Sequence, residues 1–173
     1  MLTLDRRTKN RIILVICIVI CLAVAFQFAT LSKGQDGIVN KVKKIVTKRY
    51  SNIESIWIAD AINNDSSCLF WIIVQYDGHQ FAYVPVEFEH ITGYLYRYVQ
   101  IHMPIQRSTD IACVNWNDAY HFIINDKQCC FLKLKYTNGE DELVRVNEYP
   151  FCFHSKPFPS EYYYLDGNYE ELN

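Results

Sequence analysis

Residues 68–88 have the sequence CLFWIIVQYDGHQFAYVPVEF, which carries the clearest strand signal in the chain. Two runs rich in β-branched and aromatic residues flank Asp77-Gly78, a dipeptide typical of the tight turn of a β-hairpin. In the first run, apolar residues occupy both the odd and the even positions. A strand of this kind is covered on both faces, so we expect it at the centre of an antiparallel sheet.

Further strands extend this hairpin into a meander. Upstream, a strand over residues 53–62 ends at a polar turn. Downstream, alternating runs predict strands over residues 94–103, 111–116, 119–124, 128–136 and 142–149. A helix over residues 94–103 is an alternative, but three tyrosines at every second position favour a strand.

Asn138-Gly139 marks a second strong hairpin. At an offset of 60 residues this hairpin resembles the one around Asp77-Gly78. Two interpretations follow: two cystatin-like halves, each based on a hairpin, or the chance agreement that any two hairpins with inward aliphatic residues would show.

Residues 12–31 contain no charged residue, and about 20 apolar residues are enough for a helix to cross about 30 Å of hydrocarbon. Four basic residues, Arg6, Arg7, Lys9 and Arg11, come directly before this segment. We therefore predict a retained transmembrane signal anchor over residues 12–31. A cleavable signal peptide is the competing interpretation, but residues 26–31 stay apolar after the small residues of a cleavage site.

The net charge of −2 conceals three blocks of different sign. Residues 1–11 carry +3 and residues 32–50 carry +5, so residues 51–173 hold −10. An acidic body repels nucleic-acid phosphates, so we expect no nucleic-acid partner. The basic cluster next to the anchor favours a cytoplasmic N-terminus and a C-terminal domain outside the cytoplasm.

Within residues 32–50, the stretch 38–50 places apolar side chains at helical spacing. This pattern predicts a short basic amphipathic helix, the juxtamembrane stalk. Its apolar stripe can pack on the sheet, or the helix can rest on anionic headgroups. The basic candidates for contact with the membrane surface are Lys41, Lys43, Lys44, Lys48 and Arg49.

The sequence as a whole predicts an α+β fold of five segments: a cytoplasmic basic tail over residues 1–11, a transmembrane signal anchor over 12–31, a basic stalk helix over 32–50, an extracytoplasmic, mostly antiparallel β-meander over 51–149, and a Tyr-rich acidic tail over 150–173. We expect the tail to be irregular, because it contains three prolines. This layout resembles that of the membrane-tethered cystatin-like or PepSY-like domains of bacterial envelopes, in architecture and without a diagnostic motif.

Catalytic and metal-binding motifs are mostly missing from the sequence. The body holds five cysteines, an odd number, so at least one thiol has no disulfide partner within the chain. Two interpretations of these cysteines are kept: buried free thiols, or one or two disulfides. Only Cys152 and His154 are close enough in sequence to suggest zinc ligands, which is a weak signal, and we expect neither a metal nor a cofactor.

These observations favour a non-enzymatic binding module that acts on another envelope or membrane protein. The candidate contact residues are Tyr94, Tyr96, Tyr98, Tyr162, Tyr163 and Tyr164. One alternative is a thiol-dependent enzyme or redox protein that uses Cys113 or Cys129 with His121 as the base. The other alternative is a small structural subunit of a membrane assembly.

Overall fold

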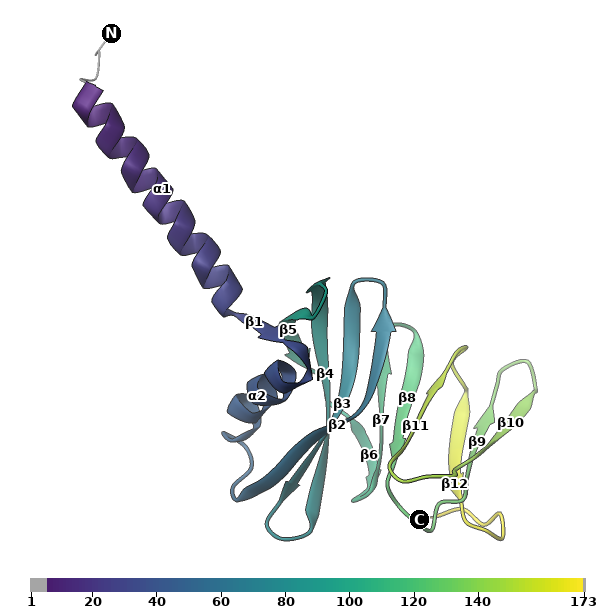
Figure 1. The fold of residues 1–173 in the computed structure, drawn as a ribbon. Coiled ribbons are helices and arrows are strands. Elements are labelled where there is room, and N and C mark those ends of the chain that lie inside the picture. Colours follow the sequence, from purple (N-terminus) through teal and green to yellow (C-terminus); the bar gives the residue numbers. More distant parts are fainter. Residues whose placement is uncertain (1–5, 173) are drawn as a thin grey trace.

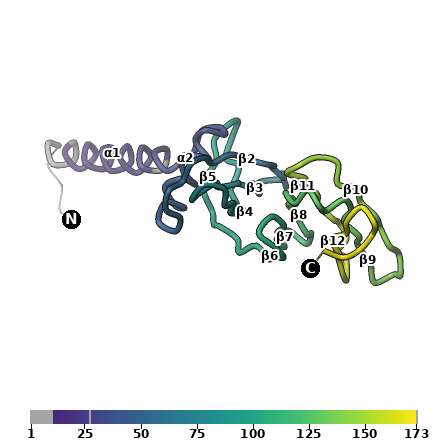
Figure 2. The backbone as a smooth tube through the Cα atoms, turned by 90° about the horizontal axis from the view of Figure 1, so that it is seen from below, coloured from purple at the N-terminus to yellow at the C-terminus, as the bar shows by residue number. Residues whose placement is uncertain are grey.

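The computed structural model describes the backbone of residues 6–172 and the side chains of residues 11–26 and 28–172. Helix α1 (Arg6–Ala29) projects away from a body in which helix α2 (Gly34–Val46) and three sheets lie one behind another (Figure 1). Figure 2 shows the same projecting helix from below. All named strand pairs are antiparallel, so the predicted, mostly antiparallel β architecture with helices is confirmed.

The first sheet has the strand order β1-β5-β4-β3-β2. Its strands are β1 (Leu31–Lys33), β2 (Ile53–Asn64), β3 (Ser67–Tyr76), β4 (Gln80–Thr92) and β5 (Leu95–Ile101). The middle sheet has the order β11-β8-β7-β6, with β6 (Ile105–Ser108), β7 (Ile111–Trp116), β8 (Ala119–Ile124) and β11 (Phe151–Ser155). The outer sheet has the order β10-β9-β12, with β9 (Phe131–Lys135), β10 (Asp141–Arg145) and β12 (Glu161–Leu165).

Strand β3 lies between β2 and β4 and is covered on both faces. Phe70 and Ile72 belong to the core beneath α2. Leu69, Trp71 and Ile73 belong to the core between the first and middle sheets. Both faces are apolar because each one packs against another layer, as the sequence of residues 68–76 predicts.

Helix α2 packs on the first sheet through Ile38, Val42 and Val46, which are buried. One of the two interpretations of residues 32–50 predicts this packing. The helix begins later than expected, because residues 31–33 form β1 instead. Gly34 follows with a φ of +62°, a left-handed conformation that interrupts a helix running on from α1.

The middle sheet is also apolar on both faces. Along β7, Ile111 and Cys113 point toward the outer sheet, whereas Ala112 and Val114 point toward the first sheet. Leu132 and Leu134 of β9 complete the core between the middle and outer sheets. The outer sheet is thus the last layer of the body, and its far face meets solvent.

The tail of residues 150–173 is not irregular, so that expectation is wrong. Strand β11 pairs with β8, and β12 pairs with β9. Phe151 and Phe153 of β11 and Tyr162 and Tyr164 of β12 supply side chains to the core, while the three prolines lie outside the strands. Residues 151–155 and 161–165 therefore belong to the folded body.

Helix α1 has 24 residues, and the large apolar side chains described in it are exposed. A single residue, Thr30, separates it from β1. When only the described residues are considered, neither helix is both long enough and apolar enough to cross a membrane.

Candidate functional site

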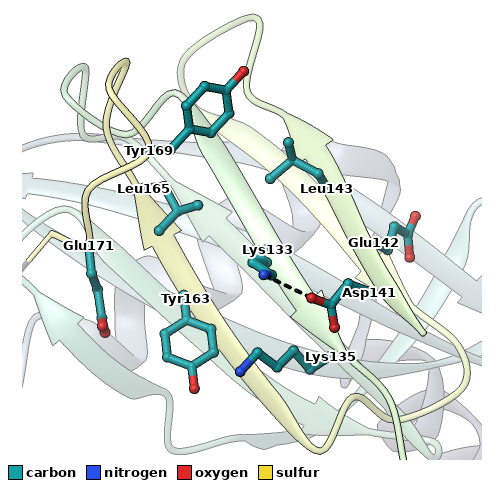
Figure 3. A pocket seen from close by; sticks show the side chains of 9 residues that line it. All are labelled: Lys133, Lys135, Asp141, Glu142, Leu143, Tyr163, Leu165, Tyr169 and Glu171. Carbon is teal, nitrogen blue, oxygen red and sulfur yellow. Dashed lines mark ion pairs between the residues drawn. The ribbon is translucent and has the colours of Figure 1, made fainter. Parts of the chain in front are cut away.

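The far face of the outer sheet carries an open groove of about 550 Å³ (Figure 3). Strands β9, β10 and β12 supply its floor, and the segment after β12 supplies one wall. The residues that line this groove are Lys133, Lys135, Asp141, Glu142, Leu143, Tyr163, Leu165, Tyr169 and Glu171. We call it the outer-sheet groove.

The strand register explains which side chains reach the groove. Leu143, Lys133 and Tyr163 are neighbours across the three strands. Side chains alternate between the two faces of a sheet, so the adjacent Leu132 and Tyr164 point inward and are buried. The alternation of polar and apolar residues in β9 therefore places lysines outward and leucines in the core.

Both lysines of the groove are paired with carboxylates. Lys133 Nζ lies 2.8 Å from Asp141 Oδ2, the pair marked by the dashed line in Figure 3. Lys135 Nζ lies 3.2 Å from Glu161 Oε2 and 4.9 Å from the ring centroid of Tyr163. The hydroxyl of Tyr163 donates a hydrogen bond of 2.7 Å to the same Glu161 oxygen.

These contacts fix the protonation states in the groove. The hydrogen bond from Tyr163, together with Lys135, lowers the pKa of Glu161. The hydrogen bond to Glu161 raises the pKa of Tyr163 and that of Lys135. Near neutral pH these three groups are therefore a carboxylate, an ammonium and a neutral phenol.

Apolar side chains form the upper part of the groove. Leu143 is 50% exposed and Tyr169 is 61% exposed. The carboxylate of Asp166 accepts hydrogen bonds from the backbone N–H groups of Asn168 and Glu170, which shapes the turn after β12. This turn stacks Tyr169 on Phe131, with ring centroids 4.7 Å apart.

The six tyrosines expected at contact surfaces are dispersed over four places. Tyr163 lines the groove, whereas Tyr162 and Tyr164 pack in the core beneath it. Tyr94 is 77% exposed and lies between β4 and β5. Tyr96 and Tyr98 pack against the core under α2, where they contact Phe70 and Phe88 edge-on.

Sequence reasoning missed most of the groove. The alternation FLKLK over residues 131–135 signals a one-sided strand, but the partner strands that bring Tyr163 and Leu143 beside it are not evident from the sequence. No sequence pattern indicates that Tyr169 lines the groove, because its position depends on the turn at Asp166.

The basic candidates on α2 and just after it lie away from this groove. Lys43, Lys44, Lys48 and Arg49 are exposed. Lys41 is partly covered, with its Nζ 5.6 Å from the ring centroid of Tyr98. The buried stripe of the helix therefore leaves most of its positive charge facing solvent.

The thiol candidates and His121 lie on opposite faces of the middle sheet. Cys113 and Cys129 belong to the core shared with the outer sheet. His121 pairs in register with Val114, whose side chain points the other way, toward the first sheet. Burial raises the pKa of the Cys113 thiol and raises that of Cys129 to about 11.

The cysteines of residues 6–172 are all present as free thiols. Within the same residues, no three His, Cys, Asp or Glu side chains gather in a way that could hold a metal ion. Cys152 and His154, the weak zinc candidates, belong to β11.

Comparisons with known proteins add no relative. No protein-family model matches the chain, and no curated protein or solved structure is significantly similar to it.

Proposed function

We propose that the protein is a membrane-anchored binding module, without catalytic activity of its own, that captures another envelope or membrane protein in the outer-sheet groove. The observation that carries this proposal is the groove itself, which combines exposed aromatic and aliphatic side chains with two lysines that are already paired with carboxylates. Protein interfaces favour exposed tyrosines of this kind at their centre.

The edge beside the groove supports a polypeptide as the ligand. Strand β10 is at the border of the outer sheet, and within residues 6–172 no strand pairs with its free edge. An extended segment of a partner can add to such an edge through main-chain hydrogen bonds and place alternate side chains in the neighbouring groove. Leu143, which points into the groove from β10, would contact these side chains.

Helix α1 supports the anchor. Within α1, residues 12–29 carry no charge and extend for about 27 Å at a rise of 1.5 Å per residue, close to the thickness of the hydrocarbon core, about 30 Å. Leu14, Val15 and Val19 are each more than half exposed, and no described part of the body covers them. A helix that is apolar all round is stable in lipid, whereas in water the same surface would be exposed at a large cost in free energy.

The charge distribution supports the orientation. Arg6, Arg7, Lys9 and Arg11 precede the uncharged segment, and long domains cross the membrane largely regardless of their charge. The body would then lie outside the cytoplasm, where the exposed lysines of α2 can approach anionic headgroups.

The thiol-enzyme alternative has less support. Thiolates are the reactive form of cysteine, and burial keeps Cys113 and Cys129 protonated near neutral pH. The sheet backbone separates both thiols from His121, the base that this mechanism would need.

Affinity capture tests the proposal. The tagged full chain is recovered from detergent-solubilised membranes as wild type and with the groove changes Leu143→Ser and Tyr163→Ser combined. The matched control combines Val99→Ser and Met103→Ser, two exposed side chains outside the groove. We expect wild type and control to recover a partner protein in stoichiometric amount. The groove variant should recover at least about tenfold less of it, which corresponds to a loss of about 1.4 kcal/mol in binding free energy. Equal recovery with all three proteins would contradict the groove as the capture surface.

A further inference from the structure

We infer that the turn between β4 and β5 is a second contact surface, and that it binds the phospholipid headgroup region of the membrane in which α1 is anchored. This inference rests on the anchor of the proposed function but assigns a surface that the groove does not use. Tyr94 in the turn is 77% exposed, and Ile91, near the end of β4 beside the turn, is 37% exposed.

The first argument is the short connection between the anchor and this turn. The backbone N–H of Gly34 donates a 2.7 Å hydrogen bond to the carbonyl of Tyr94. Gly34 follows the last residue of α1, Ala29, by five residues, which span at most about 18 Å of chain. The turn therefore stays close to the end of α1, whatever angle the body takes.

The second argument is that the connection is a paired strand and not a free linker. Leu31 pairs with Arg97, and Lys33 pairs with Leu95. Because only Thr30 separates β1 from α1, the end of the helix is attached directly to the edge of the first sheet. Figure 1 shows β1 and β5 together where α1 meets the body.

The third argument is the chemistry of the exposed side chains. Tyrosine is enriched at membrane–water interfaces, because its ring favours the apolar side while its hydroxyl stays hydrated. Ile91 adds apolar area beside it. Lys33, exposed and opposite Leu95 in the register, provides an ammonium for headgroup phosphates.

The fourth argument is the defined shape of the turn. A ring nitrogen of His90, Nε2, lies 2.8 Å from the carbonyl oxygen of Gly93, and the His90 ring is 5.4 Å from that of Tyr96. Gly93 adopts a φ of +53°. The turn thus holds Tyr94 outward before it meets lipid, which reduces the entropy lost on binding.

Paramagnetic NMR with the full chain tests this inference. The protein is placed in nanodiscs of phosphatidylglycerol and phosphatidylcholine that contain a lipid with a nitroxide on its headgroup. We expect the amide signals of residues 91–94 to lose several-fold more intensity than that of Met103, an equally exposed residue beyond β5. Equal losses at the two places would overturn the inference, and this comparison needs no variant.

A variant pair tests the side chains. With Ile91→Ser and Tyr94→Ser combined, the intensity loss at Leu95 should fall several-fold, whereas Met103→Ser should leave it unchanged. An unchanged loss at Leu95 in the double variant would overturn the role of these two side chains. Failure of the protein to enter the bilayer at all would instead remove the anchor, and with it the proposed function.

Discussion

His121 is the buried titratable side chain whose state is best defined by its contacts. Its Nε2 lies 3.1 Å from the carbonyl oxygen of Trp116. A carbonyl only accepts, so we assign the ring proton to Nε2 and leave Nδ1 unprotonated. Nδ1 is buried and has no hydrogen-bond partner among the described residues. Burial lowers the pKa of His121 below its ordinary value of 6.5.

The lowered pKa predicts a loss of stability in mild acid. As the pH falls below 6.5, the unfolded chain binds a proton at this histidine that the folded chain does not, so the free energy of unfolding decreases. In His121→Gln, thermal unfolding in mild detergent should depend less on pH between about pH 7.5 and about pH 5 than in wild type. The same dependence in both proteins would show that other groups cause it.

The cysteines lead to a count that can be measured. Cys17, Cys21, Cys68, Cys113, Cys129, Cys130 and Cys152 are all free thiols. Alkylation in denaturant without a reductant should therefore modify all seven, as read by intact mass, because no pair is joined by a disulfide. Cys68 and Cys113, which are buried, should be protected before denaturation. A mass short by two alkyl groups would reveal a disulfide.

Single residues also show the limit of sequence reasoning. The pattern at residues 162–164 predicts tyrosines near a surface, but it does not indicate which of them faces outward. That choice depends on β9, the partner of β12, which contributes Leu132 and Leu134 to the core. Tyr163 lines the groove because its neighbours on the strand pack against those leucines.

At the scale of elements, local patterns predict the strands well. Residues 119–124 form the strand expected there, and the expected strands over residues 53–62 and 68–76 are present as β2 and β3. Turn dipeptides and alternation act within a few residues, so a single sequence contains the information. Strands β11 and β12 escaped prediction because prolines surround them, and long-range pairing with β8 and β9 makes them regular.

Helix α2 gives a stability prediction for an element. Ile38 is fully buried between the helix and the first sheet. Replacing it by alanine removes apolar contacts and leaves a cavity, so Ile38→Ala should lower the free energy of unfolding by about 2–5 kcal/mol. The matched control, Lys43→Ala on the exposed face of α2, should change it by less than about 0.5 kcal/mol. Denaturant titration followed by tryptophan fluorescence compares the two, and equal effects would contradict the packing of α2.

At the scale of the whole molecule, strands that are apolar on both faces already indicate several layers. Strand β3 predicts a covered sheet from its sequence alone. The division into three sheets is not predictable in the same way, because β9 pairs with β12 across an intervening segment that contains β10 and β11. The groove exists only once this pairing is made, so neither its position nor its residues follow from local patterns.

The membrane anchor is a prediction about the whole molecule. The full chain should remain in the membrane fraction after alkaline carbonate washing, and protease added from outside should remove a C-terminal tag. The combined changes Ile16→Lys and Val19→Lys should release the protein from the membrane fraction, since each charge within a spanning helix costs about 2.5–3.5 kcal/mol. A soluble wild-type product that begins near Phe26 would show cleavage in place of anchoring.

The capture of another protein in the outer-sheet groove is tested most directly by photo-crosslinking in the living cell. A benzophenone amino acid replaces Tyr163 in the groove or, as a control, Met103 outside it. We predict that illumination joins the protein to one discrete partner from position 163, that position 103 gives no such product, and that adding Leu143→Ser weakens the product from 163. The same product from both positions, or none from position 163, would contradict the assignment of the groove as the binding site.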